Sequence, residues 1–227
     1  MQILLPIHIL AGTIALLCAA LAVSAEKGKR LHVLSGRAYF WSMAIIFLTA
    51  IPMSIISSNI FLFLIAIFAF YLAFAGMRFA RNRKGITTTL DWIAVSLVIL
   101  SGLGMLILAA IFFSNDDSQY IVLLVFGFLA ITIGYADFKT YKNNTATGKE
   151  RISRHLSNMM GGTIALLCAA LAVSSKKGKR LHVLSGRAYF WSMATIFLTA
   201  IPMSIISSNI FLFLIAIFSF YLAFAGM

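Results

Sequence analysis

Acidic residues are the scarcest feature of this 227-residue sequence, which has six Asp and Glu against 18 Lys and Arg and a net charge of +12. Charged residues of both signs make up only 11% of the chain, while hydrophobic residues make up 62%. A soluble domain of this length needs a larger polar surface than these residues supply. The composition therefore excludes an ordinary soluble globular protein and indicates a membrane protein.

Residues with catalytic chemistry are also few. The two cysteines, Cys18 and Cys168, lie in apolar runs, which is typical of small buried side chains and not of reactive thiolates. The sequence has no H-E-x-x-H motif and no G-x-S-x-G nucleophile elbow. We place Asp91 and Asp137 at the ends of predicted helices and therefore expect no carboxylate inside the membrane. No catalytic residue is predicted, and an enzyme is the less favoured class.

Long apolar runs are what the sequence has in abundance. A helix needs about 20 apolar residues to cross a bilayer, and helices satisfy their own backbone polar groups in hydrocarbon. We predict an all-α fold, a polytopic transmembrane helix bundle of about eight helices. The predicted spans are approximately residues 3–23, 38–56, 60–77, 92–113, 120–135, 156–173, 188–206 and 210–227.

The basic residues are confined to alternate connections through the sixth predicted helix, and the connections between them, "ISSNI" and "SNDDSQ", have none. The positive-inside rule places the N-terminus outside and the basic loops in the cytoplasm. The first apolar run has no basic residues before it, so we expect a membrane span and not a cleaved signal peptide. We assign the positive charge to anionic lipid headgroups, at about 1 kcal/mol per residue, and not to nucleic acid. The basic connections lie in residues 27–37, 78–84, 139–154 and 176–187.

A near-copy of residues 11–77 occupies residues 161–227. The pairs that differ are Ala11/Gly161, Ala25/Ser175, Glu26/Lys176, Ile45/Thr195 and Ala69/Ser219. The copy divides the chain into a bundle over residues 1–160, with about five helices and the start of the sixth, and a duplicate over residues 161–227. The segment "GTIA" is shared by the first and sixth helices, which predicts a recent rearrangement or gene join and not an evolved transport symmetry. Because the first helix runs inward and the sixth outward, the two "KGKRLHVLSGR" loops are expected on opposite sides of the membrane.

Four segments carry a family resemblance: "IHILAGTIAL", "LHVLSGRAYFWSM", "YLAFAGMRFARNRKG" and "RISRHLSNMMGG". Together they resemble the bacterial multi-pass membrane proteins grouped as domain of unknown function 2306, over about residues 1–165. The resemblance implies a protein of the bacterial cytoplasmic (inner) membrane with no assigned activity. In that family the pattern after "HLSNMMGG" continues into its own closing helices. We therefore expect the functional unit to comprise residues 1–165 and such closing helices, with the copy in their place here.

Histidines are the candidate binding residues, because a histidine inside a membrane helix is costly to bury. His8 lies near the outer end of the first helix, and His32 and His155 lie at the inner starts of the second and sixth. Each shares a helical face with a glycine, which leaves room for a flat macrocycle. Paired neutral imidazoles hold haem iron or another metal, so haem b is a candidate cofactor. The alternative is that these histidines form interfacial or interhelical hydrogen bonds.

Three functions are consistent with the sequence. The first is a multi-pass membrane protein of unknown specific role, structural or accessory. The second is a haem- or metal-binding membrane redox protein that uses the helix histidines. The third is a small-solute transporter, whose polar lining would come from Thr49, Ser54, Ser96 and Ser101.

Overall fold

The computed structural model describes residues 2–117 and 119–174. Within them the chain forms six α-helices and no strand, which agrees with the predicted all-α bundle. The predicted spans at 188–206 and 210–227 lie outside the described residues, so the total of about eight helices stays a prediction. The helices are α1 (Leu4–Ser24), α2 (Arg30–Ile56), α3 (Ile60–Arg81), α4 (Thr89–Ser114), α5 (Tyr120–Lys142) and α6 (Gly148–Ser174).

Five of these helices, α1 to α5, are long and apolar enough to cross a bilayer. Their outward faces expose large apolar side chains, of which Leu48 and Ile107 are examples. Such surface is unfavourable in water and is normal against lipid tails. The described part of the chain is therefore a helical bundle with five candidate membrane spans.

Helices α2 to α6 extend beyond the apolar runs that predicted them, and α2, α5 and α6 extend furthest. α2 begins at Arg30 and not at residue 38, α5 continues to Lys142, and α6 begins at Gly148. All three extensions carry charged residues. A helix that has started continues to pair its backbone groups after it leaves the hydrocarbon, so its apolar stretch is shorter than the helix itself.

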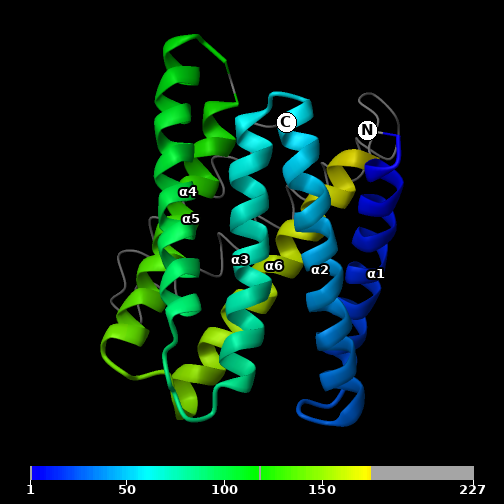
Figure 1. Cartoon of the computed structure of the whole chain (residues 1–227), viewed down its shortest axis with the longest axis vertical. Coiled ribbons are helices and arrows are strands. Elements are labelled where there is room, and N and C mark those ends of the chain that lie inside the picture. Colours follow the sequence, from blue (N-terminus) through cyan, green and yellow to red (C-terminus); the bar gives the residue numbers. More distant parts are fainter. Residues whose placement is uncertain (1, 118, 175–227) are drawn as a thin grey trace, which may run out of the picture. The chain divides into compact units, whose positions relative to one another are not determined.

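The helices pack as two antiparallel pairs on either side of α3, as Figure 1 shows. α1 packs against α2, α4 packs against α5, and α3 contacts α2, α4 and α5. α6 runs obliquely across this layer. Its first turns contact the C-terminal end of α3 through Arg151, and further along Leu166 packs against the apolar cluster of α1 and α2.

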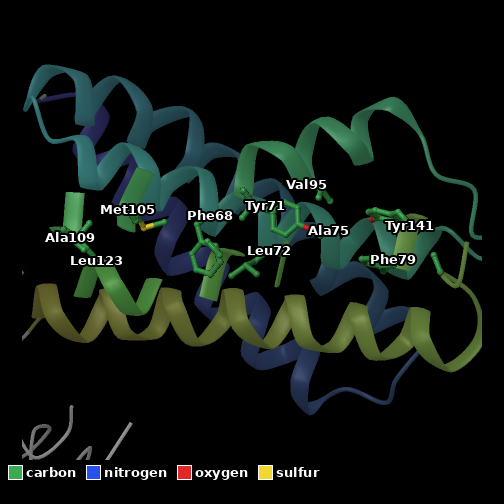
Figure 2. Close-up of a cluster of buried hydrophobic side chains, with 13 residues drawn as sticks. Phe68, Tyr71, Leu72, Ala75, Phe79, Val95, Met105, Ala109, Leu123 and Tyr141 are labelled. Carbon is green, nitrogen blue, oxygen red and sulfur yellow. The ribbon is translucent and has the colours of Figure 1, made fainter. Parts of the chain in front are cut away.

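The larger apolar core lies between α3, α4 and α5 (Figure 2). Phe68, Leu72 and Phe79 from α3 meet Met105 from α4 and Leu123 from α5. At one end of this core the rings of Phe79 and Tyr141 stack with their centroids 5.1 Å apart. α3 therefore forms the centre of the packing and holds the elements that carry the polar side chains described below.

The contact between α4 and α5 is close because glycines face each other. A Cβ atom on Gly102 would lie 2.9 Å from the carbonyl oxygen of Gly127, and one on Gly127 would lie 3.0 Å from that of Gly102. Both distances are too short for a carbon against a backbone oxygen that has no freedom to rotate away. Small residues at such crossings allow membrane helices to approach closely.

Replacing Gly102 with alanine is expected to lower the free energy of unfolding by about 1–3 kcal/mol, because the helices must separate to admit the methyl group. The measurement is thermal or denaturant unfolding in detergent. Gly12→Ala is the matched control, since no atom lies within 4 Å of a Cβ atom there. In a helix that change alone favours alanine by about 0.5–1 kcal/mol. Equal stability of the two variants would contradict the close contact.

Candidate functional site

The polar contacts between helices gather at one end of the bundle. We call this the basic end and define it by the loops at residues 25–29, 82–88 and 143–147, which lie together in Figure 1. It contains the C-terminal ends of α1, α3 and α5 and the N-terminal ends of α2, α4 and α6. Basic side chains of the first three basic connections surround it.

His32 and His155 meet at the basic end. Their rings, from α2 and α6, have centroids 6.4 Å apart and are perpendicular. The two residues are 123 positions apart in the sequence (155 − 32), and the packing of α6 across the bundle brings them together. Of the three histidines singled out from the sequence, these two form a pair.

Each ring of the pair is held by a backbone carbonyl. Nδ1 of His32 lies 2.9 Å from the oxygen of Ala22 in α1, and Nδ1 of His155 lies 2.8 Å from the oxygen of Gly76 in α3. A carbonyl only accepts hydrogen bonds, so Nδ1 carries the proton in both rings. In the neutral form this leaves the Nε2 lone pair free on each ring, which is the state that binds a metal.

The surroundings of His155 favour its neutral form. The residue is half-buried and lies outside the five helices that are candidate membrane spans. Burial lowers the pKa of its imidazole, because a charged ring loses hydration there. Arg151 and His32 act in the same direction through their charges. The ring is therefore available as a neutral base or ligand at neutral pH.

His8 lies at the other end of the bundle, in the second turn of α1. Its Nδ1 is 2.9 Å from the hydroxyl oxygen of Thr49 in α2. The Thr49 hydroxyl donates to the carbonyl oxygens of Ile45 and Ile46, so His8 donates to Thr49. The structure places this histidine in an interhelical hydrogen bond, away from the pair of His32 and His155.

The glycines near the histidines differ in the space that they leave. Next to His32, a Cβ atom on Gly36 would meet no atom within 4 Å, and the same holds for Gly12 near His8. The space beside Gly162, one of the glycines on the face of His155, is occupied, since a Cβ atom there would lie 2.8 Å from the Tyr39 hydroxyl. The position beside Gly36 on the His32 helix is therefore open, whereas that beside Gly162 is filled.

A buried carboxyl was missed by the sequence prediction. Asp137 was expected at a helix end, but α5 continues past it to Lys142, and its side chain is fully buried. It accepts hydrogen bonds from the Tyr71 hydroxyl and from the Asn158 amide. The spacing of Arg154 and Asn158, four residues apart on α6, is the one local signal that a polar helix face meets this carboxyl.

An ion pair joins α3 to α4. The Arg78 guanidinium donates to both carboxylate oxygens of Asp91, over 2.7 and 2.9 Å, and the carboxylate is buried. Asp91 also accepts from the backbone and hydroxyl of Thr88, which forms the capping box of α4. Arg151 of α6 donates to the carbonyl oxygens of Phe79 and Ala80 near the C-terminus of α3. These contacts order the helix ends around the histidine pair.

Within residues 2–117 and 119–174, no group of three or more His, Cys, Asp or Glu side chains lies close enough to hold a metal ion. The pair of His32 and His155 therefore offers two protein ligands.

Comparisons of the chain with protein-family models, with curated proteins and with solved structures find no match.

Proposed function

We propose that this protein is a redox protein of the bacterial cytoplasmic membrane that binds haem b through His32 and His155. The observation that supports it is the pair itself: two imidazoles from different helices, each with Nδ1 on a carbonyl oxygen and Nε2 free. Haem iron in membrane bundles is held by such side chains on facing helices. The resemblance to the domain of unknown function 2306 family supports the bacterial location.

The spacing of the rings fits two ligands on one metal. A metal–imidazole bond is about 2 Å, so two imidazoles in line on one metal have ring centroids roughly 6 Å apart. The observed distance between the centroids is 6.4 Å. A direct hydrogen bond between the rings requires one Nε2 to carry a proton, but both protons lie on Nδ1. In the neutral state the rings therefore make no hydrogen bond to each other through Nε2, which leaves both lone pairs available to a ligand.

The ligand set distinguishes haem from a bare metal ion. Zinc and similar ions take three or four protein ligands, and the described residues offer two histidines here. Haem brings four ring nitrogens of its own and needs only axial ligands. The position beside Gly36 is open, which supports a flat group there, and Arg30 and Arg37 of the same helix would supply cations for its carboxylates. When bound, haem would supply one-electron transfer, and the chain would hold and orient it.

The visible absorption spectrum of the purified protein tests this proposal. We expect a Soret band and, after reduction, a sharp α-band, either as isolated or after addition of hemin to the protein in detergent. The two axial histidines predict a low-spin spectrum. A folded protein that shows neither band after hemin addition would overturn the proposal and leave a structural or accessory role.

The transporter alternative has less support in the described residues. The hydroxyls of Thr49, Ser54 and Ser101 donate to carbonyl oxygens of their own helices. They are therefore satisfied locally and offer little to a solute. Ser96 is on the exposed face of α4.

Anionic lipid at the basic end is the second part of the proposal. An open hollow of about 410 Å³ lies at the connection of α3 and α4. It is lined by Arg78, Arg81, Asn82, Arg83, Lys84 and Ile86. Arginine and lysine side chains around such a hollow bind phosphate groups, which supports placing the basic end at the anionic cytoplasmic leaflet.

This orientation predicts which loops react with an impermeant thiol reagent in intact cells. Asn115 and Asn143 are a matched pair, because each follows the last residue of a helix and each is exposed. In a background without Cys18 and Cys168, we expect Asn115→Cys to be labelled from outside and Asn143→Cys to be protected. Both should react after the cells are opened. Labelling of Asn143→Cys alone would reverse the proposed orientation.

A further inference from the structure

We infer that Asp137 is a buried proton-binding site, whose carboxyl group carries a proton at neutral pH on the oxygen Oδ1. The ligand is a single proton, and binding converts the carboxylate into the neutral acid. This inference is independent of the haem proposal, since it concerns α3, α5 and the polar face of α6. It rests on burial, on unpaired atoms and on the charged side chains nearby.

The carboxyl group has no access to water. Asp137 is 0% exposed and Asn158 is 1% exposed. One carboxyl oxygen, Oδ2, accepts from the Tyr71 hydroxyl over 2.7 Å and from the Asn158 amide nitrogen over 3.1 Å. Figure 2 shows that Tyr71 lies within the apolar cluster, beside Phe68 and Leu72. A charged group in such surroundings is costly unless every lone pair is matched by a donor.

Two buried oxygens here have no donor. Oδ1 of Asp137 and Oδ1 of Asn158 are both without a hydrogen-bond partner. Rotating the Asn158 amide does not solve this, because its nitrogen already faces two acceptors, Asp137 Oδ2 and the carbonyl oxygen of Arg154. The cluster lacks a hydrogen. A proton on Oδ1 of Asp137 makes that oxygen a donor, and the neighbouring Asn158 oxygen is the acceptor that lacks one.

The charged side chains around Asp137 would leave the negative charge of its carboxylate uncompensated. Arg154 donates from Nε to Glu150 over 2.8 Å, whereas the same nitrogen is 3.8 Å from Oδ1 of Asp137. One guanidinium therefore faces two carboxyl groups and is hydrogen-bonded to Glu150. The other titratable side chains near Asp137 are Tyr71 from α3 and Tyr141 from α5, which are neutral. With Asp137 ionised, its carboxylate would be a buried charge without a hydrogen-bonded cation, because the partly exposed Arg154 bonds the partly exposed Glu150.

A proton fits this site better than a cation or a water molecule. A metal cation needs more oxygen ligands than the two unpaired ones, and the described residues form no such group. A water molecule donates to both oxygens but leaves the charge unbalanced. A proton supplies the missing donor and removes the buried charge together. Arg154 is partly exposed and lies 3.8 Å from Oδ1, so this side of the carboxyl group is the one nearest to solvent.

Infrared spectroscopy tests the inference on the intact protein in lipid nanodiscs at neutral pH. The chain has six acidic residues, and the others described are exposed or hydrogen-bonded to cations or backbone, so a protonated-carboxyl C=O band has one expected source. We expect this band in the wild type, shifted by D2O and by 13C-aspartate labelling. It should be lost in Asp137→Asn and kept in Glu26→Gln and Asp91→Asn, two carboxyl groups outside this cluster.

A second variant keeps the test informative if Asp137→Asn does not fold. Asp137→Glu keeps the carboxyl group and should keep the band at a changed frequency. Absence of the band from folded wild-type protein would overturn the inference and leave an ionised Asp137 hydrated by water. A band that moves with 13C-glutamate, or that persists in Asp137→Asn, would overturn it by locating the proton elsewhere.

Discussion

Replacing His155 with alanine is expected to abolish the haem spectrum, and replacing His32 with alanine to do the same. Each variant removes one of the two Nε2 atoms that the pair presents. His8→Ala is the matched control, because His8 is bonded to Thr49 at the other end of the bundle. It should keep the full Soret band. The measurement is haem content per protein after hemin addition and purification, with an expected loss of more than about tenfold for either ligand.

A variant that fills the space beside Gly36 tests haem binding without removing either histidine. Gly36→Leu leaves both histidines in place, and no atom lies within 4 Å of the position of its Cβ atom. The variant should therefore fold as the wild type does and lose haem by exclusion. Gly12→Leu, equally open and near His8, should keep haem. Haem loss in His8→Ala with retention in His155→Ala would contradict the proposed pair.

Replacing Arg78 with methionine is expected to cost about 3–5 kcal/mol of unfolding free energy, because it leaves a carboxylate in a buried site without its cation. Asp91 is 1% exposed and accepts both arginine hydrogen bonds. Thermal or denaturant unfolding in detergent measures the loss. The double variant with Asp91→Asn should recover part of it, since the uncompensated charge is then removed.

The exposed pair of Lys29 and Glu26 is the control for the ion pair. Its nitrogen and oxygen are 2.6 Å apart, but the side chains are 68% and 69% exposed. An exposed pair contributes roughly 0–1 kcal/mol, so Lys29→Met should change stability little. Similar losses for Arg78→Met and Lys29→Met would indicate that burial of Asp91 does not set the cost.

The sequence predicted the helices that its apolar runs cover, and it misplaced the ends that continue in polar residues. Hydropathy reports which residues enter hydrocarbon, whereas a helix ends where its backbone bonds end. α5 shows the consequence: treating residue 135 as its last residue placed Asp137 at a helix end, while the helix runs on to Lys142. For that reason the prediction did not identify Asp137 as a buried carboxyl group.

Long-range partners explain the rest of what the sequence did not reveal. The histidines were found because each is a rare residue in an apolar context, but their meeting depends on how α6 crosses the bundle. Tyr71 and Asn158, which bond Asp137, lie 66 and 21 residues from it along the chain. The spacing of Arg154 and Asn158 indicates a polar face on α6, but no local pattern indicates which residues that face contacts. The two predicted parts, residues 1–160 and 161–227, stay a prediction, as does the orientation of the copied loop.

The side-chain bonds between helices are unevenly distributed along the bundle. In the half toward the basic end, such bonds link α3 to α4, α5 and α6, and link α1 to α2. In the other half of the described bundle, the corresponding bond is that of His8 with Thr49. Thermal fluctuations that separate helices therefore cost least in the half that contains His8 and Thr49, where mainly side-chain packing opposes them. Lipid tails and small apolar molecules would enter between the helices from that end, while the basic end stays closed.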